Sequence, residues 1–132
     1  MSLRDEDRQV VVALEIEKVD KTLSQIGTLV DNNLWDLVAN RLYYALFHSV
    51  SAMFINDRHE IGTHRGAVNK FSLFYVKAGR FTKEEGRLYS RLQRLREDGD
   101  YNCYMDVEKE EVEEFLQPTM QLIEKIKNYI HQ

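Results

Sequence analysis

The feature that most constrains this sequence is a long apolar segment from Leu34 to Ile55. Its apolar residues recur at three- and four-residue intervals and cover nearly every side of a helix. They are Trp35, Leu37, Val38, Leu42, Tyr43, Leu46, Phe47, Val50, Met53 and Phe54. A membrane helix needs about 20 apolar residues, and Asp36, Arg41 and His48 interrupt this run, so we expect no membrane partner. A soluble helix that is apolar all round must be buried, which predicts that this segment is the central element of the fold.

The rest of the chain is also predicted to be helical. One proline and six glycines in 132 residues leave little material for turns. Besides the central segment, we expect helices at about Asp5–Val30, at a short stretch ending near Ala78–Gly79, from Thr82 to a break at Gly99, and from a cap at Asp106 onward. Short connections favour an all-α fold, an antiparallel up-and-down bundle of about five helices.

Apolar spacing also predicts which side chains face the core. In the short third helix these are Val68, Phe71, Phe74 and Tyr75. In the last helix they are Val112, Phe115, Thr119, Ile123, Ile126 and Ile130. Thr82 and Glu85 have the spacing of a capping box. Trp35, Tyr43 and Phe74 exceed what the core needs, so we consider them for a contact with a second copy of the chain.

Composition places the chain among soluble globular proteins. Apolar residues make up 43% and charged residues 30%, which excludes the disordered and membrane classes. The length predicts one domain, at residues 4–132, with residues 1–3 as an expression leader. The single cysteine, Cys103, cannot form an internal disulfide, and the chain shows no secretory signal. We therefore expect a cytoplasmic protein.

The net charge of −4 conceals an uneven distribution. Residues 58–96 contain ten Lys and Arg against three Glu, whereas the remainder has eight against nineteen Asp and Glu. A basic middle attracts phosphate groups, but the acidic ends argue against binding along an extended nucleic acid. The alternative interpretation is a set of ordinary solvated helix faces.

The central segment carries an unusual polar cluster. Arg41, Tyr44 and His48 are three and seven residues apart, which places them on one helical face. In the functional interpretation, Arg41 clamps a phosphate or nucleotide and His48 donates or accepts a proton. In the structural alternative, Arg41 pairs with Glu17 or Asp100, and His48 bonds a backbone carbonyl.

A second cluster lies at the end of the fourth predicted helix. Arg96, Asp100 and Tyr101 fall within six residues. They either cap the helix and form a surface ion pair or make a second lobe of a pocket beside Arg41. We expect no metal and no cofactor, because the remaining histidines lack ligand spacing and no Gly-rich phosphate loop is present. The predicted ligand-binding residues are Arg41, Tyr44, His48, Arg96, Asp100 and Tyr101.

Three segments of the chain carry a family resemblance. They are residues 40–48 (NRLYYALFH), residues 63–79 with the motifs THRG and YVKAG, and residues 95–101 (LREDGDY). In this order and spacing they resemble the central-helix signature and the two later blocks of the prokaryotic HEPN family, the higher-eukaryote and prokaryote nucleotide-binding domain. The match extends over nearly the whole chain.

The resemblance implies a helical bundle that is usually dimeric and lies beside a minimal nucleotidyltransferase in a toxin–antitoxin-type system. One hypothesis is a noncatalytic homodimer that binds a nucleotidyltransferase partner or a nucleotide. The other is a metal-independent ribonuclease, in which Arg41 stabilises the phosphorane and His48 moves the proton of the RNA 2′-hydroxyl. Catalytic branches place their Arg and His on a late helix, where this chain has Arg96 and no histidine through Cys103.

The two hypotheses predict different surroundings for Arg41 and His48. A binding module is expected to lock both side chains in an internal polar network. A ribonuclease is expected to expose them together in a basic cleft at a two-fold contact.

Overall fold

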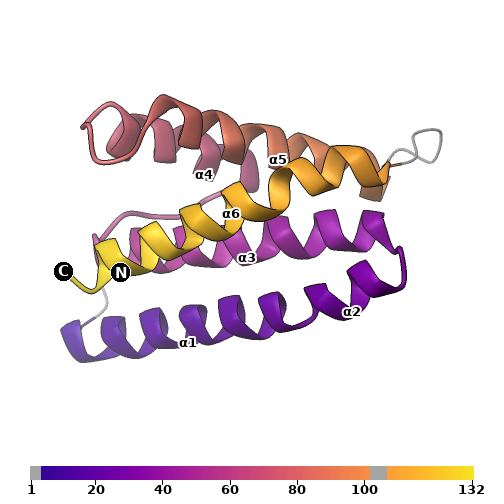
Figure 1. The fold of residues 1–132 in the computed structure, drawn as a ribbon. Helices are drawn as coiled ribbons and strands as arrows, with labels where there is room; N and C mark the ends of the chain where they lie inside the picture. Colours follow the sequence, from indigo (N-terminus) through magenta and orange to yellow (C-terminus); the bar gives the residue numbers. More distant parts are fainter. Residues whose placement is uncertain (1–3, 102–106) are drawn as a thin grey trace.

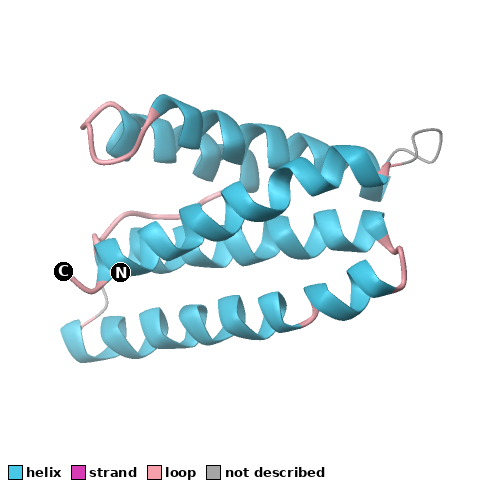
Figure 2. Cartoon of the chain, in the orientation of Figure 1, coloured by secondary structure: helices cyan, strands magenta, loops and turns pink. Residues whose placement is uncertain are grey.

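The computed structural model of the chain is a bundle of helices (Figure 1). It describes residues 4–101 and 107–132, and of residues 99–101 it describes only the backbone. Within these ranges every regular element is a helix (Figure 2). The elements are α1 (Asp5–Ser24), α2 (Ile26–Asp31), α3 (Trp35–Asn56), α4 (His64–Phe71), the π-helical segment η1 (Ser72–Val76), α5 (Lys83–Tyr101) and α6 (Lys109–Ile130). The predicted all-α bundle is confirmed.

The long apolar segment forms α3, the central helix of the bundle. α3 packs against α1, α2, α4, α5 and α6, and Figure 1 shows it between α1 and the layer that contains α4 and α5. Leu42, Tyr43 and Leu46 are completely buried, and Trp35 is also buried. The interpretation of Trp35 and Tyr43 as surplus interface residues is therefore wrong, because the surrounding helices use both as core. Leu37 differs from the other large apolar residues of α3, since 45% of its surface is exposed.

The first predicted helix is in fact two helices. A helix expected over residues 5–30 breaks at Gln25, between α1 and α2 (Figure 1). The hydroxyl of Ser24 donates to a backbone carbonyl three residues earlier at 2.6 Å, and the N–H of Gln25 donates to the carbonyl of Thr22 at 3.2 Å. Gly27, a weak helix former, follows the break. Side-chain bonds to the backbone compete with the helical pattern, which apolar spacing alone does not register.

The short third helix is divided into α4 and η1. Thr63 caps α4, its hydroxyl accepting from the N–H of Gly66 at 2.9 Å. The π-helical turn of η1 adds a residue per turn and rotates later side chains relative to an α-helix. Phe74 therefore faces outward, 37% exposed, and stacks on His59 with ring centroids 4.3 Å apart. The prediction that Phe74 packs inward is wrong, whereas the other three residues predicted to face inward here are buried.

α5 begins at the predicted capping box and ends later than predicted. The N–H of Glu85 donates to the hydroxyl of Thr82 at 3.1 Å, and the N–H of Thr82 donates to the carboxylate of Glu85 at 2.7 Å. The helix continues through Gly99 to Tyr101, so the predicted break is wrong. A single glycine costs a helix only about 1 kcal/mol relative to alanine, which the preceding packed turns can offset.

α6 buries the apolar stripe that its sequence predicts. It follows Glu108, while the predicted cap, Asp106, lies outside the described residues. Its buried residues are Val112, Phe115, Thr119, Leu122, Ile123, Ile126 and Ile130. In the described ranges, no helix is both long enough and apolar enough to cross a membrane.

Replacing Leu46 by alanine tests the central position of α3. Leu46 is completely buried, and truncating a buried leucine costs about 2–5 kcal/mol through lost contacts and a residual cavity. The control Leu73→Ala removes the same atoms from a side chain that is 52% exposed, where we expect a change within about 0.5 kcal/mol. Urea denaturation followed by circular dichroism measures both. Equal losses of stability in the two variants would contradict the central position of α3.

Candidate functional site

Three candidate residues lie along one line on the surface of α3. Tyr44 is in the middle. The guanidinium carbon of Arg41 lies 5.5 Å from the centroid of the Tyr44 ring, and the centroid of the His48 ring lies 6.3 Å from it. All three side chains are partly exposed, although most of α3 is buried. The shared face expected from their spacing is therefore present.

A carboxylate from α1 holds His48. Nδ1 of His48 lies 2.8 Å from Oε2 of Glu15, and Oε1 of the same carboxylate accepts from the ammonium of Lys18 at 3.3 Å. The side chains of His48 and Glu15 are only 23% and 14% exposed. An ionised carboxylate can only accept hydrogen bonds, so Nδ1 of His48 carries the proton and Nε2 faces away from Glu15. The expected bond from His48 to a backbone carbonyl is replaced by this one, because α1 packs its acidic side chain against α3.

Two amides hold Arg41 at the other end of the line. Nε and Nη2 of Arg41 donate to Oδ1 of Asn40 at 3.0 and 2.6 Å, and Nη1 donates to Oε1 of Gln25 at 3.4 Å. In the part of the chain that the structure describes, the expected pair with Glu17 does not form, because Glu17 lies on the exposed side of α1. The other expected partner, Asp100, is described only by its backbone. Both partners are neutral amides, so these bonds orient the guanidinium without neutralising its charge.

α5 brings a second arginine to the same place. The guanidinium carbon of Arg96 lies 4.6 Å from the ring centroid of Tyr43 and 5.7 Å from that of Tyr44, although Arg96 is almost fully buried. Arg41 and Arg96 thus both lie against the ring of Tyr44, at distances typical of cation–π contacts. The side chains of residues 100–101, the other candidates in this cluster, lie outside the description.

His64 also belongs to this cluster, and the sequence does not predict it. Its Nδ1 lies 2.6 Å from the hydroxyl oxygen of Tyr43, and its ring centroid lies 4.4 Å from that of Phe47. Burial lowers the pKa of His64, and the nearby charges of Arg96 and His48 lower it further. Burial raises the pKa of Tyr43. Tyr43 is therefore the donor to Nδ1, and His64 is neutral at neutral pH.

The sequence around His64 contains one local signal, the N-terminal cap of α4. The cap formed by Thr63 and Gly66 fixes His64 as the first residue of α4. A cap predicts where a helix begins, but it does not predict which helix its first turn contacts. The contact with Tyr43 joins residues that are 21 positions apart, and it appears only when α4 is packed against α3.

An exposed ion pair lies beside the cluster, between α4 and α5. Arg65 donates through Nε and Nη2 to the two carboxylate oxygens of Glu97 at 3.3 and 3.1 Å. The hydrogen bond from Arg65 is the main reason that the pKa of Glu97 is lowered. Across the described ranges, no three His, Cys, Asp or Glu side chains gather where they could hold a metal ion. The cluster instead combines guanidinium groups, aromatic faces and imidazoles, which suits a phosphate-bearing ligand.

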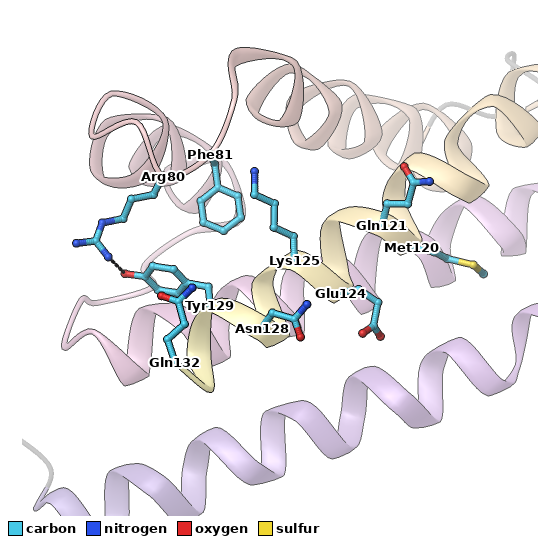
Figure 3. Close-up of a pocket in the computed structure, with 9 residues that line it drawn as sticks. All are labelled: Arg80, Phe81, Met120, Gln121, Glu124, Lys125, Asn128, Tyr129 and Gln132. Carbon is cyan, nitrogen blue, oxygen red and sulfur yellow. Dashed lines mark hydrogen bonds between the residues drawn. The ribbon is translucent and has the colours of Figure 1, made fainter.

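A separate depression lies between α6 and the loop before α5 (Figure 3). Its volume is about 510 Å³, and Arg80, Phe81, Lys125 and Tyr129 are among the residues that line it. Arg80 donates to the hydroxyl of Tyr129 at 3.1 Å, the dashed line in Figure 3. Lys125 donates to the carboxylate of Glu85 at 2.7 Å. These bonds tie α6 to its neighbours, and the depression shares no lining residue with the cluster on α3.

The lowered pKa of His64 predicts a pH dependence of stability. A histidine whose pKa is lower in the folded state stabilises the fold fully above its unfolded pKa, about 6.5, and this contribution is lost as the pH falls through the folded pKa. His64→Gln removes that contribution. We expect the free energies of unfolding of the wild type and the variant to converge as the pH is lowered from about 8 to about 5.

Urea denaturation across this pH range measures the convergence. His131→Gln is the control, because His131 is exposed near the end of the chain and the variant should keep the wild-type dependence. A difference between wild type and His64→Gln that stays constant with pH would show that His64 is not held neutral by its surroundings.

Comparisons with known proteins point to one family. A family model described as "HEPN domain" matches residues 13–129. The chain is 30% identical over 125 residues to a Methanocaldococcus jannaschii protein named "Putative toxin MJ0605", covering 95% of this chain and 92% of that protein. It is 25% identical over 115 residues to "Putative toxin MJ0142" of the same organism, covering 87% and 78%. It is 27% identical over 124 residues to a UPF0332 protein of Thermotoga maritima, covering 94% of each. With a family model matched over most of its length, this chain belongs to the HEPN domain family.

Proposed function

We propose that this chain is a noncatalytic HEPN module that binds a nucleotide or a protein partner through the Arg41 face. The Arg41 face consists of Arg41, Tyr44, His48, His64 and Arg96. The observation that carries the proposal is the position of Tyr44 between the two residues that a ribonuclease would use. Its ring lies between the guanidinium of Arg41 and the imidazole of His48.

This separation matters because RNA cleavage needs both groups at one phosphate. The attacking 2′-hydroxyl is adjacent to the phosphate, so the base and the charge-stabilising group must lie within hydrogen-bond reach of neighbouring atoms. Arg41 and His48 are seven residues apart, which is about 10 Å along a helix. The bonds from Arg41 to Asn40 and Gln25 hold its guanidinium near the α1–α2 junction. Within one copy of the chain, Arg41 and His48 are therefore too far apart to act on the same phosphate.

The same residues form a suitable surface for an anion. Arg41 is oriented by neutral amides and keeps its charge, and the almost fully buried Arg96 adds a positive potential beside Tyr44. A neutral His64, protonated on the nitrogen that faces away from Tyr43, can donate a further hydrogen bond. Fixed donors of this kind bind phosphate with little loss of side-chain entropy.

The proposed setting is a toxin–antitoxin-type system. Two relatives carry the name "Putative toxin", which supports this setting. From the family resemblance we further propose that residues 4–132 act as one domain, form a homodimer in the cytoplasm and pair with a minimal nucleotidyltransferase. Asp100 and Tyr101 follow Arg96 by about one turn of α5 and are proposed to extend the Arg41 face toward its ligand or partner.

A second candidate function is a metal-independent ribonuclease that uses Arg41 and His48. The bond from His48 to Glu15 favours it, because a carboxylate that keeps the proton on Nδ1 of His48 leaves Nε2 able to accept a proton from a 2′-hydroxyl. This mechanism needs an arginine close to His48. Arg96 is almost fully buried, so a second copy of the chain would have to supply an exposed arginine across a two-fold contact.

Incubating the purified protein with a mixed RNA pool and a chelator separates the two functions. We expect no cleavage by the wild type. We also expect His48→Ala to be less stable by about 1–3 kcal/mol, because Oε2 of the mostly buried Glu15 loses its partner. Arg94→Ala and His131→Ala are matched controls, since both residues are exposed.

Cleavage of RNA that depends on Arg41 and His48 would contradict the noncatalytic proposal. The noncatalytic proposal would be wrong if the wild type cleaved RNA, if Arg41→Ala and His48→Ala abolished cleavage while keeping the wild-type circular dichroism spectrum, and if Arg94→Ala and His131→Ala kept full activity. The chain would then be a ribonuclease that works through the Arg41 face.

A further inference from the structure

An open pocket lies beside the Arg41 face, where the α1–α2 junction meets α3. We call it the junction pocket; its lining includes Gln25, Leu29, Leu37, Asn40 and Arg41. Its volume is about 590 Å³, within the range of about 300–1,000 Å³ that is usual for small-molecule sites. It shares Arg41 with the Arg41 face and is otherwise formed by different residues.

The break between α1 and α2 shapes the junction pocket. Residues on both sides of Gln25 line one wall, and the first turns of α3 form the other. Leu37 belongs to the second wall. It is 45% exposed, although a large apolar side chain on the central helix gains most when it is buried. The chain thus leaves an aliphatic surface open next to a cation.

Three polar side chains in the lining of the junction pocket are linked by hydrogen bonds. The side-chain oxygens of Asn40 and Gln25 both accept from the guanidinium of Arg41. These bonds hold the planar guanidinium in one orientation within the lining of the pocket. Leu37 and Arg41 are four residues apart, which is one helical turn or about 6 Å along α3.

We propose that the junction pocket holds the base of a nucleotide whose phosphate is bound by Arg41. This proposal rests on the nucleotide-binding branch of the proposed function. A nucleotide combines a flat ring with two apolar faces, a polar ring edge and an anionic phosphate. These three parts match, in order, the aliphatic wall of Leu29 and Leu37, the amide of Gln25 and the guanidinium of Arg41.

The rival occupant is an apolar side chain from a second copy of the chain. Such an occupant would use Leu37 but would not need the charge of Arg41. The polar groups favour a nucleotide, because Arg41 donates its hydrogen bonds to neutral amides and so keeps a positive charge that an anion can neutralise.

Isothermal titration with AMP and with adenosine tests the proposal. Leu37→Gln removes the aliphatic wall without adding charge, and we expect it to weaken the binding of both ligands about tenfold, the effect of roughly 1.4 kcal/mol. Leu73→Gln makes the same change at another exposed leucine and should leave both affinities unchanged. Arg41→Gln should weaken the binding of AMP and leave adenosine unaffected. Saturation-transfer NMR on the wild type should show the base protons closer to the protein than the ribose protons.

Each of three other outcomes would contradict the proposal that the junction pocket holds the base of a nucleotide. If AMP binds and Leu37→Gln matches Leu73→Gln, the base is held elsewhere, while nucleotide binding by the Arg41 face stands. If Leu37→Gln dissociates a dimer and leaves AMP affinity unchanged, the occupant is a second copy. If neither AMP nor adenosine binds to the wild type, the pocket proposal fails together with the nucleotide branch, and only the partner branch of the proposed function remains.

Discussion

The burial of α3 is the constraint on which the rest of the structure depends. Because α3 is apolar on most of its sides, it must be covered on those sides, and α1, α2, α4, α5 and α6 cover it. A polar side chain on such a helix is costly unless a neighbour bonds it. Arg41, Tyr44 and His48 lie along one line at the surface, and neighbouring helices supply partners to Arg41 and His48. The Arg41 face is a direct consequence of how the core is packed.

The partners of the Arg41 face come from separate elements. Glu15 belongs to α1 and Gln25 to the α1–α2 junction, whereas His64 lies on α4 and Arg96 on α5. Side chains that are held from several directions are ordered before a ligand arrives, so less conformational entropy is lost on binding. A binding module benefits from this order. Catalysis within one copy would also need a proton-transfer group next to a charge-stabilising group, and on α3 the ring of Tyr44 separates them.

Local patterns predict part of this structure and tertiary contacts decide the remainder. The all-round apolar character of α3 and the Thr82 capping box are local properties, and both predictions are confirmed. The break at Gln25 and the outward turn of Phe74 depend on backbone bonding that apolar spacing does not register. In the candidate site, spacing places Arg41, Tyr44 and His48 on one face. It could not place His64 there, because that contact requires α4 to be packed against α3.

The protonation pattern of two histidines tests most directly whether neighbouring helices hold the Arg41 face. A long-range proton–nitrogen NMR spectrum at neutral pH reports which ring nitrogen carries the proton. We expect a proton on Nδ1 of His48 that responds to Glu15→Gln, and a neutral His64 protonated on Nε2 that responds to Tyr43→Phe. Signals of two freely exchanging imidazoles that ignore both variants would show that the internal network is absent and would contradict the central claim.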